Sequence, residues 1–170
     1  KYNGQFHIID NLYSNRPNKD YVAFFGSTNG ATIENIGITN ANVTGDGDVG
    51  SLAGIIANTT VRNCFSTGNV AGKGYAIGGL IGMNSHGSTI SRSFSRATVN
   101  ALSSGISVGG LTGSNSGVIS KCFSHGNVSN GSTLGGLVGS NNVAGSIYNS
   151  YSIGAVSGSG DDIGGLVGNN

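Results

Sequence analysis

Charged side chains are scarce in this sequence. Asp, Glu, Lys and Arg make up 9% of its 170 residues, whereas they make up about 25% of an average soluble protein. Eight basic residues against seven acidic ones leave a formal net charge of +1. The chain therefore lacks the basic footprint of a nucleic-acid-binding protein and the polybasic segment that binds anionic lipid. We expect no nucleic acid as a partner, and the near-neutral total disfavours polyanions in general.

Long apolar runs are also missing. No stretch of about 18 apolar residues occurs, so we expect no membrane insertion. The first residues, KYNGQFHIID, show neither an initiator Met nor the basic and then apolar plan of a signal peptide, which indicates a piece of a longer protein. Low charge can indicate disorder, but 36% of the residues are hydrophobic and they recur at fixed places. The sequence therefore predicts an ordered chain.

Sequence signatures of metal sites and of catalysis are absent. No CxxC or HExxH motif occurs, and His7, His86 and His125 are scattered along the chain, so we expect no zinc site and no cofactor. The paired carboxylates of a glycosidase are missing as well. Away from its turns, the repeat region offers Glu34 and four isolated basic residues, Arg62, Arg92, Arg96 and Lys121. The chain is therefore predicted not to be an enzyme.

Glycine, by contrast, is abundant, with 32 residues of 170 against a usual share of about 7%. Much of it recurs in one phrase: IGGLIG at 77–82, VGGLTG at 108–113, LGGLVG at 134–139 and IGGLVG at 163–168. YVAFFG at 21–26 and VGSLAG at 49–54 are interpreted as diverged copies. The fourth residue of each copy serves as an anchor. The anchors are spaced by 28, 28, 31, 26 and 29 residues: Phe24, Leu52, Leu80, Leu111, Leu137 and Leu166.

The stretches between anchors repeat too, as TVRNCFSTGNV, TISRSFSRATV, VISKCFSHGNV and SIYNSYSIGAV. Each unit has three short apolar segments separated by Gly, Ser and Asn, and none keeps a helical period long enough to predict a helix. A period of about 20 to 50 residues is typical of arrays whose units bury their apolar faces by stacking. We predict an all-β single-stranded parallel β-helix (solenoid) of about six coils of 26–31 residues, with three short strands per coil. Residues 1–170 are predicted to form one domain, with 1–26 as its leading coil.

A glycine pair can cradle a phosphate when a helix follows it, and no helix is predicted here. The spacing of three between Val108 and Leu111 breaks strict strand alternation. If both side chains point inward, the two glycines between them must bend the backbone. We therefore interpret the phrase as a corner of the coil.

The phrases GGLIG, GGLTG and GGLVG, each followed by a polar turn and a segment such as ISKCFSHGNV, resemble the GLUG repeat of bacterial surface and secreted proteins. Residues 1–26 resemble the coil that precedes such repeats, so the resemblance extends over essentially the whole chain. It implies a region of a surface adhesin or of a secreted immunoglobulin-A-cleaving zinc metalloprotease, and therefore an extracellular, secreted or cell-surface location. Val22, Ala23 and Ser51 depart from the glycine pair.

Cys64 and Cys122 fall in one column of the repeat, with Ser93 between them. One unit per coil places the two cysteines two coils apart, roughly 9.6 Å at a strand spacing of about 4.8 Å. A disulfide tolerates Cα separations only up to about 7 Å. Both thiols are therefore predicted to be free and to act as small core residues.

One column is aromatic throughout, and its members are the candidate binding residues: Phe65, Phe94, Phe123 and Tyr151. Aromatic ladders in stacked coils are usually core, which is the first interpretation. The second follows from parity, because the residues on either side are Cys or Ser. If these small side chains point inward, the rings point outward and could contact a sugar or a partner surface.

Acids gather in two turns that precede an anchor phrase, Asp46 and Asp48 in GDGD and Asp161 and Asp162 in GSGDD. Calcium is conceivable there, since it binds several carboxylate and carbonyl oxygens. The middle copies lack these acids, so solvated turns are favoured over a repeated calcium site. Four N-glycosylation sequons also occur, at Asn42, Asn58, Asn127 and Asn130.

The function predicted from these patterns is a non-catalytic extracellular structural or adhesive module of a bacterial surface or secreted protein. One alternative is a domain that binds a glycan or a host protein. Another is an accessory segment of a secreted zinc metalloprotease. The partners expected are accordingly a host glycan, a host protein, or a second copy that pairs end to end through a terminal coil.

Overall fold

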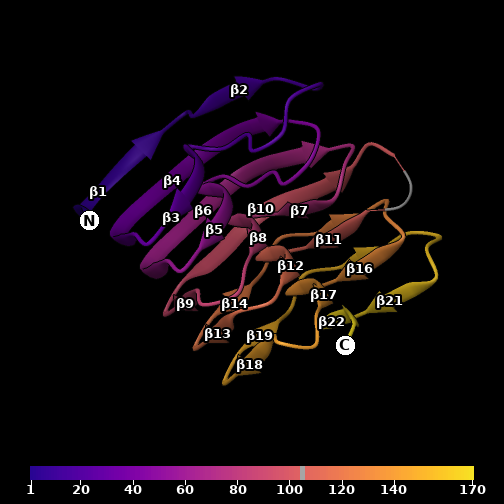
Figure 1. Ribbon diagram of the computed structural model, residues 1–170. Helices are drawn as coiled ribbons and strands as arrows, with labels where there is room; N and C mark the ends of the chain where they lie inside the picture. Colours follow the sequence, from indigo (N-terminus) through magenta and orange to yellow (C-terminus); the bar gives the residue numbers. More distant parts are fainter. Residues whose placement is uncertain (104–105) are drawn as a thin grey trace.

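The computed structural model describes residues 1–103 and 106–170, and within them the chain is all-β, with no helix. The chain winds through parallel sheets and stacks about six coils side by side from the N-terminus to the C-terminus (Figure 1). Because the described residues hold no helix, none is present that is long and apolar enough to cross a membrane. The predicted parallel β-helix is confirmed.

Three sheets form the walls of the solenoid, and we name them A, B and C. Sheet A has twelve strands: β1 (Tyr2–Asp10), β2 (Tyr13–Asn15), β4 (Thr32–Thr44), β6 (Thr60–Gly72), β9 (Thr89–Ser91), β10 (Phe94–Ala101), β13 (Val118–Ser120), β14 (Phe123–Ser124), β15 (Val128–Ser129), β18 (Ser146–Tyr148), β19 (Tyr151–Ser152) and β20 (Val156–Ser157). Sheet B has six: β3 (Phe25–Asn29), β5 (Ala53–Ala57), β8 (Ile81–Asn84), β12 (Thr112–Asn115), β17 (Val138–Asn141) and β22 (Val167–Asn169). Sheet C has four: β7 (Ala76–Gly78), β11 (Ser107–Gly109), β16 (Thr133–Gly135) and β21 (Asp162–Gly164).

Each strand pairs in parallel with its counterpart one repeat further along the chain. In sheet A, Ile33 pairs with Val61, Val61 with Ile90, and Ile90 with Ile119. These are the columns obtained by aligning the repeat units. The register therefore confirms one repeat unit per coil.

The core lies between the three sheets and consists of apolar columns. Leu80 and Leu111, the anchors of two middle coils, have no exposed surface, and burying such a side chain contributes about 1.5–3 kcal/mol. The end coils differ, because Tyr21 in the first glycine phrase is 47% exposed and Leu166 in the last is 40% exposed. A column is thus buried by the coils on both sides of it, as expected for a stacked array.

The glycine pair makes the corner between sheets C and B, as predicted, but it does so for reasons of space. Neither Gly109 nor Gly110 has a positive φ. A methyl group on Gly110 would overlap Ser124 Oγ and the carbonyl oxygen of Gly136 in the next coil. The corner needs glycine because a serine of sheet A packs directly onto the turning backbone.

Sheet A bends once in each coil, at a residue in the left-handed region of backbone conformation. The five residues of this bend column have φ between 46° and 56°: Asn35, Asn63, Arg92, Lys121 and Asn149. Asn tolerates this conformation, whereas Arg and Lys are strained in it. The bend separates β9 from β10 and β13 from β14.

Cys64 and Cys122, which follow the bend column, are free and buried, as predicted. The Cys64 N–H donates to Ser93 Oγ of the next coil at 3.1 Å, so the serine stands between the two cysteines in the stack. Burial raises the pKa of both thiols to about 11. Both are therefore protonated at neutral pH and act as core residues.

Candidate functional site

The aromatic column lies on the outer face of sheet A. Phe65 is half-buried, while Cys64 before it and Ser66 after it are buried, so its ring points away from the core. Phe94 repeats this alternation, and Tyr151 is 50% exposed. Of the two interpretations that the sequence left open, the outward one describes the structure.

The rings stack on one another along the solenoid axis. The centroids of Phe94 and Phe123 are 4.6 Å apart with ring planes at 5°, and Phe65–Phe94 and Phe123–Tyr151 are 5.1 and 5.3 Å apart at 8° and 12°. The ring faces between these residues are therefore covered by neighbouring rings. The column offers a partner mainly ring edges, which carry the positive part of the aromatic quadrupole.

Basic side chains flank the rings on both sides. Arg92 and Lys121, both exposed, stand two positions before Phe94 and Phe123. On the other side, the guanidinium of Arg96 lies 5.4 Å from the Phe94 ring centroid. The three basic residues, which we call the cationic strip, form no ion pair with any residue that the structure describes.

Sequence reasoning treated these three residues as isolated, because they are separated along the chain. A signal for two of them was nevertheless present, since Arg92 and Lys121 occupy the same column of the repeat. One unit per coil places such residues on neighbouring strands. Arg96 joins them because side chains alternate along this segment: Ser93 and Ser95 are buried, whereas Arg92 and Arg96 are exposed on the outer face.

An apolar hollow of about 300 Å³ lies at the N-terminal end of the ring column. Phe6, Ile8 and Phe65 line it together with Arg92. Phe6 is 74% exposed and Ile8 57% exposed. Gly37 also lines this hollow. It packs against the Phe65 ring so closely that a methyl group at position 37 would overlap the ring. The hollow thus extends the aromatic face toward β1 and brings an arginine beside apolar surface.

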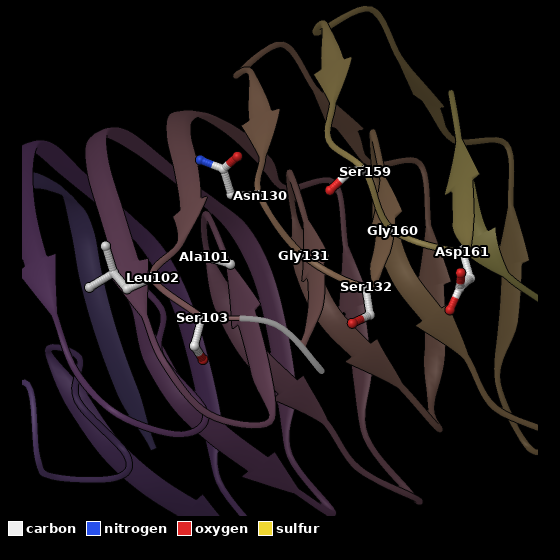
Figure 2. A pocket seen from close by; sticks show the side chains of 9 residues that line it. All are labelled: Ala101, Leu102, Ser103, Asn130, Gly131, Ser132, Ser159, Gly160 and Asp161. Carbon is white, nitrogen blue, oxygen red and sulfur yellow. The ribbon is translucent and has the colours of Figure 1, made fainter.

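A second hollow, of about 470 Å³, crosses the turns that follow sheet A. Figure 2 shows that its lining comes from three successive coils: Ala101, Leu102, Ser103, Asn130, Gly131, Ser132, Ser159, Gly160 and Asp161. Asp161 is the one ionisable side chain among these nine. The hollow therefore brings together no acid–base pair from the residues described.

Asp46 and Asp48 share one turn and Asp161 lies in another, as predicted, whereas Asp162 is the first residue of β21. Asp48 is the most buried of the four. Burial, and secondly the charge of Asp20, raise the pKa of Asp48 to about 6. Among residues 1–103 and 106–170, no group of three or more His, Cys, Asp or Glu side chains could hold a metal ion.

Glu34 is a buried carboxylate of sheet A. Lys1 Nζ lies 2.9 Å from Oε1, and Arg62 Nε donates to Oε2 at 2.6 Å. These partners, Lys1 first and Arg62 second, hold the pKa of Glu34 below its usual value. Since Arg62 is paired in this way, it is excluded from the cationic strip.

The three histidines are not brought together. His7 and His86 are exposed in separate parts of the solenoid. His125 packs against the ring column, with its ring centroid 4.8 Å from that of Phe123 and 6.0 Å from that of Tyr151. The four sequon residues are all exposed: Asn42, Asn58, Asn127 and Asn130.

Comparison with known proteins supports the solenoid fold. No protein-family model matches the chain. Halomucin from Haloquadratum walsbyi is 42% identical over 91 residues, which are 53% of this chain and 1% of halomucin. The crystal structure of a candidate immunoglobulin A1 protease from Bacteroides ovatus superimposes with a TM-score of 0.71 at 22% identity, covering 100% of this chain and 68% of that one. This structural likeness shows a shared fold.

Proposed function

We propose that this chain is a non-catalytic structural and adhesive module of an extracellular or cell-surface protein. The observation that carries the proposal is the in-register stack of coils, in which sheet A runs from β1 to β20 as one continuous outer face. Such an array displays a long surface while its core stays buried. The proposed role needs no chemical step.

The comparisons support a location outside the cell. The names of the two similar proteins refer to a mucin and to immunoglobulin A1, and both of these are found outside cells. The resemblance of the glycine phrases to GLUG repeats points the same way. The chain spans only 1% of the halomucin, so the activity of any larger protein that contains this module is a separate matter.

The side chains that could perform catalysis support a non-catalytic role. The two thiols are buried with pKa values of about 11, and the hollow of about 470 Å³ beside Asp161 holds a single carboxylate among its lining residues. Glu34 is paired with two cations. None of these groups is placed as a nucleophile with an adjacent base.

Surface display tests this proposal. The chain is displayed on a bacterium that does not adhere, and attachment to mucin-coated and epithelial-cell-coated surfaces is counted. We expect attachment to rise severalfold with the parent chain and to fall to background with Leu111→Asp, which should not fold. The proposal would be contradicted if cells that display the chain attach no better than cells that display none. Cleavage of immunoglobulin A1 by the purified chain would contradict it as well.

A second candidate function is an accessory segment of a secreted protease. The observation that favours it is the match of the whole chain to 68% of the Bacteroides ovatus structure. The purified chain is then expected to bind immunoglobulin A1 without cleaving it. Surface plasmon resonance with immobilised immunoglobulin A1 distinguishes the two, since the adhesive module needs no affinity for that protein.

A further inference from the structure

We propose that the outer face of sheet A binds an acidic polysaccharide, laid along the solenoid axis over the cationic strip and the ring column. This inference rests on the adhesive function proposed above and names the ligand class of that function. The ligand's carboxylate or sulfate groups contact Arg92, Lys121 and Arg96. Its sugar rings lie against the aromatic edges and the apolar hollow beside Phe65.

The charges of the chain are separated in space although their sum is near zero. Arg92, Arg96 and Lys121 have no acidic partner within ion-pair distance among the described residues. Two acids lie on the early strands of sheet A, Asp10 on β1 and Glu34 on β4, and Glu34 is paired with Lys1 and Arg62. The other acids lie in the turns that follow sheet A or at the start of β21: Asp20, Asp46, Asp48, Asp161 and Asp162. The near-neutral total argues against polyanions as a class, so the proposal depends on this separation. The residues that line the hollow beside Phe65 include no carboxylate, and the charged residues of β9 to β14 are Arg92, Arg96 and Lys121. A ligand that lies over these two parts of the face therefore meets cations.

Two of the three cations occupy strained positions. Arg92 and Lys121 have φ of 46° and 55°, where Asn is the better residue, and Asn stands at the other three positions of the bend column. Asn also continues a side-chain ladder there, since Asn63 Nδ2 donates to Asn35 Oδ1 at 2.9 Å. Arg92 continues this ladder through Nε, which donates to Asn63 Oδ1 at 3.1 Å and fixes the guanidinium on the outer face. Lys121 has no side-chain hydrogen bond among the described residues, and backbone strain at a residue without such a structural role points to function. We therefore assign the principal contacts with the ligand's charges to these two side chains.

The aromatic column suits an anionic ligand better than a neutral one. Interior ring faces are covered, which removes the usual stacking of sugars on aromatic faces. The exposed edges carry positive potential and attract carboxylate or sulfate oxygens. Arg92 adds a planar donor beside Phe6 and Ile8, so one ligand can present an anion to the guanidinium and C–H groups to the apolar wall.

The spacing of the cations favours a polysaccharide over an acidic peptide. Arg92 and Lys121 stand on neighbouring coils, about 4.8 Å apart along the axis, and each sugar of an extended chain advances by roughly one such spacing. An extended peptide advances by about 3.3 Å per residue and presents every second side chain to one face, so its acidic groups recur at about 6.6 Å, which is wider than the coil spacing. Nucleic acid is disfavoured because three cations release few counterions.

Titration calorimetry on the 170-residue chain tests the proposal with four polymers at low salt: polygalacturonate, heparin, neutral dextran and polyglutamate. We expect binding to one or both acidic glycans, weakening as salt is added, and no binding to dextran. Arg92→Asn combined with Lys121→Asn is expected to weaken that binding at least about tenfold. Its melting temperature should equal or exceed that of the parent, because Asn suits the bend column.

A matched control removes the same charge elsewhere. Lys19→Asn combined with Lys73→Asn changes two exposed lysines of the turns that follow sheet A and should leave glycan affinity unchanged. An equal loss in this control would mean that net charge alone drives binding, which overturns the proposal. Binding to dextran as tight as to the acidic glycans, or unchanged affinity of the Arg92 and Lys121 double variant, overturns it as well.

Two further outcomes separate the ligand class from the adhesive function. Polyglutamate bound as tightly as the acidic glycans would assign the face to an acidic protein and overturn the polysaccharide. If the displayed chain still mediates attachment when Arg92 and Lys121 are both Asn, the adhesive function stands and the assignment to sheet A falls. Loss of attachment in that variant, with retained folding, supports both.

Discussion

The early and the late coils of this solenoid differ in the length of their strands and in the sheet that carries an asparagine ladder. In the early coils β4 and β6 run for 13 residues each, whereas β14 and β15 in a late coil have 2 residues each. The early coils carry an asparagine ladder on sheet A, through Asn3, Asn35 and Asn63, whereas the late coils carry an asparagine column on sheet B. Nδ2 of each residue donates to Oδ1 of the next, at 2.6, 2.7 and 2.8 Å: Asn84, Asn115, Asn141 and Asn170.

Where the early and the late coils meet, the asparagine column begins with an unsatisfied hydrogen-bond acceptor. The early coils place Thr28 and Ile56 in the column that Asn84 begins. Ile56 cannot donate, and Asn84 Oδ1 is buried without a hydrogen-bond partner among the described residues. An unsatisfied buried acceptor costs about 1–3 kcal/mol. The comparison teaches that an amide column stabilises a stack where it is continuous and weakens it where it begins.

The largest expected effect comes from a charge in the late core. Leu111 is fully buried, and Leu111→Asp should cost more than about 5 kcal/mol because the carboxylate has no partner there. Neighbouring coils should lose protection together, since each coil is buried by the next. Circular dichroism melts and hydrogen exchange measure both effects.

Leu166→Asp is the matched control for Leu111→Asp, since it lies in the same column of the last coil and is 40% exposed. Leu166→Asp should lower the free energy of unfolding by only a small fraction of the loss caused by Leu111→Asp. If Leu111→Asp melts like the parent, the Leu column is not core.

Breaking the asparagine column should have the next largest effect. Asn115→Leu leaves Asn84 Nδ2 and Asn141 Oδ1 without the partners that they have now, at a cost of about 2–4 kcal/mol. Urea denaturation measures it. Ile56→Asn sharpens the comparison, because it places a donor opposite Asn84 Oδ1 and should cost only about 1 kcal/mol despite removing a buried Ile. An Asn115→Leu variant that is more stable than the parent would show that the asparagine column does not stabilise the fold.

The glycine corner is expected to show a position-dependent effect within one column. Gly110→Ala brings a methyl group onto Ser124 Oγ and a backbone carbonyl of the next coil and should destabilise the chain by about 1–3 kcal/mol. Gly165, in the last coil, has nothing within 4 Å of such a methyl group. Gly165→Ala should therefore be neutral or stabilising by about 0.4–1 kcal/mol. Equal losses at both positions would indicate a conformational rather than a spatial need for glycine.

The smallest effect concerns Asp48 in the early region. Its pKa is raised from 3.8 to about 6, so the folded state holds this proton more tightly than the unfolded state. As pH rises from about 4 to about 6, the free energy of unfolding of the parent should fall. Above that range the folded state carries the full cost of the buried Asp48 carboxylate. Asp48→Asn, which suits the φ of 52° there, should be more stable by on the order of 1 kcal/mol at pH 7 after solvent screening.

At pH 3 the Asp48→Asn variant and the parent should match, because Asp48 is protonated in both states. Denaturant midpoints at the two pH values provide the measurement. A variant that gains as much at pH 3 as at pH 7 acts through something other than this titration.

The fold could be predicted from the sequence because its core columns are visible as repeated residue types. Leu80 and Leu111 recur at a nearly constant spacing with apolar partners three positions before them, and stacking is the one way for such short units to bury them. The free thiols followed from the same spacing. The corner was predicted as well, although the reason for its glycine, a serine of the next coil, depends on a contact that is remote in sequence.

The surface and the amide column could not be predicted in the same way. Asn84 and Asn115 look like turn residues in the sequence, since Asn is usual in turns. The bend column contains Asn63 and Lys121, whose different side chains hid their common backbone role. Ring direction depended on parity, which an unseen bend can reverse. The clustering of Arg92, Arg96 and Lys121 was hidden by a net charge close to zero.

One repeat unit per coil is the central claim, and an introduced thiol tests it most directly. The account places position 93 one coil from both Cys64 and Cys122, about 4.8 Å away, and the two cysteines roughly 9.6 Å from each other. Ser93→Cys is refolded under oxidising conditions together with the parent, and disulfides are mapped by mass spectrometry. The account predicts a bond from position 93 to Cys64 or Cys122 and no bond in the parent. A Cys64–Cys122 disulfide in the monomeric parent would contradict it.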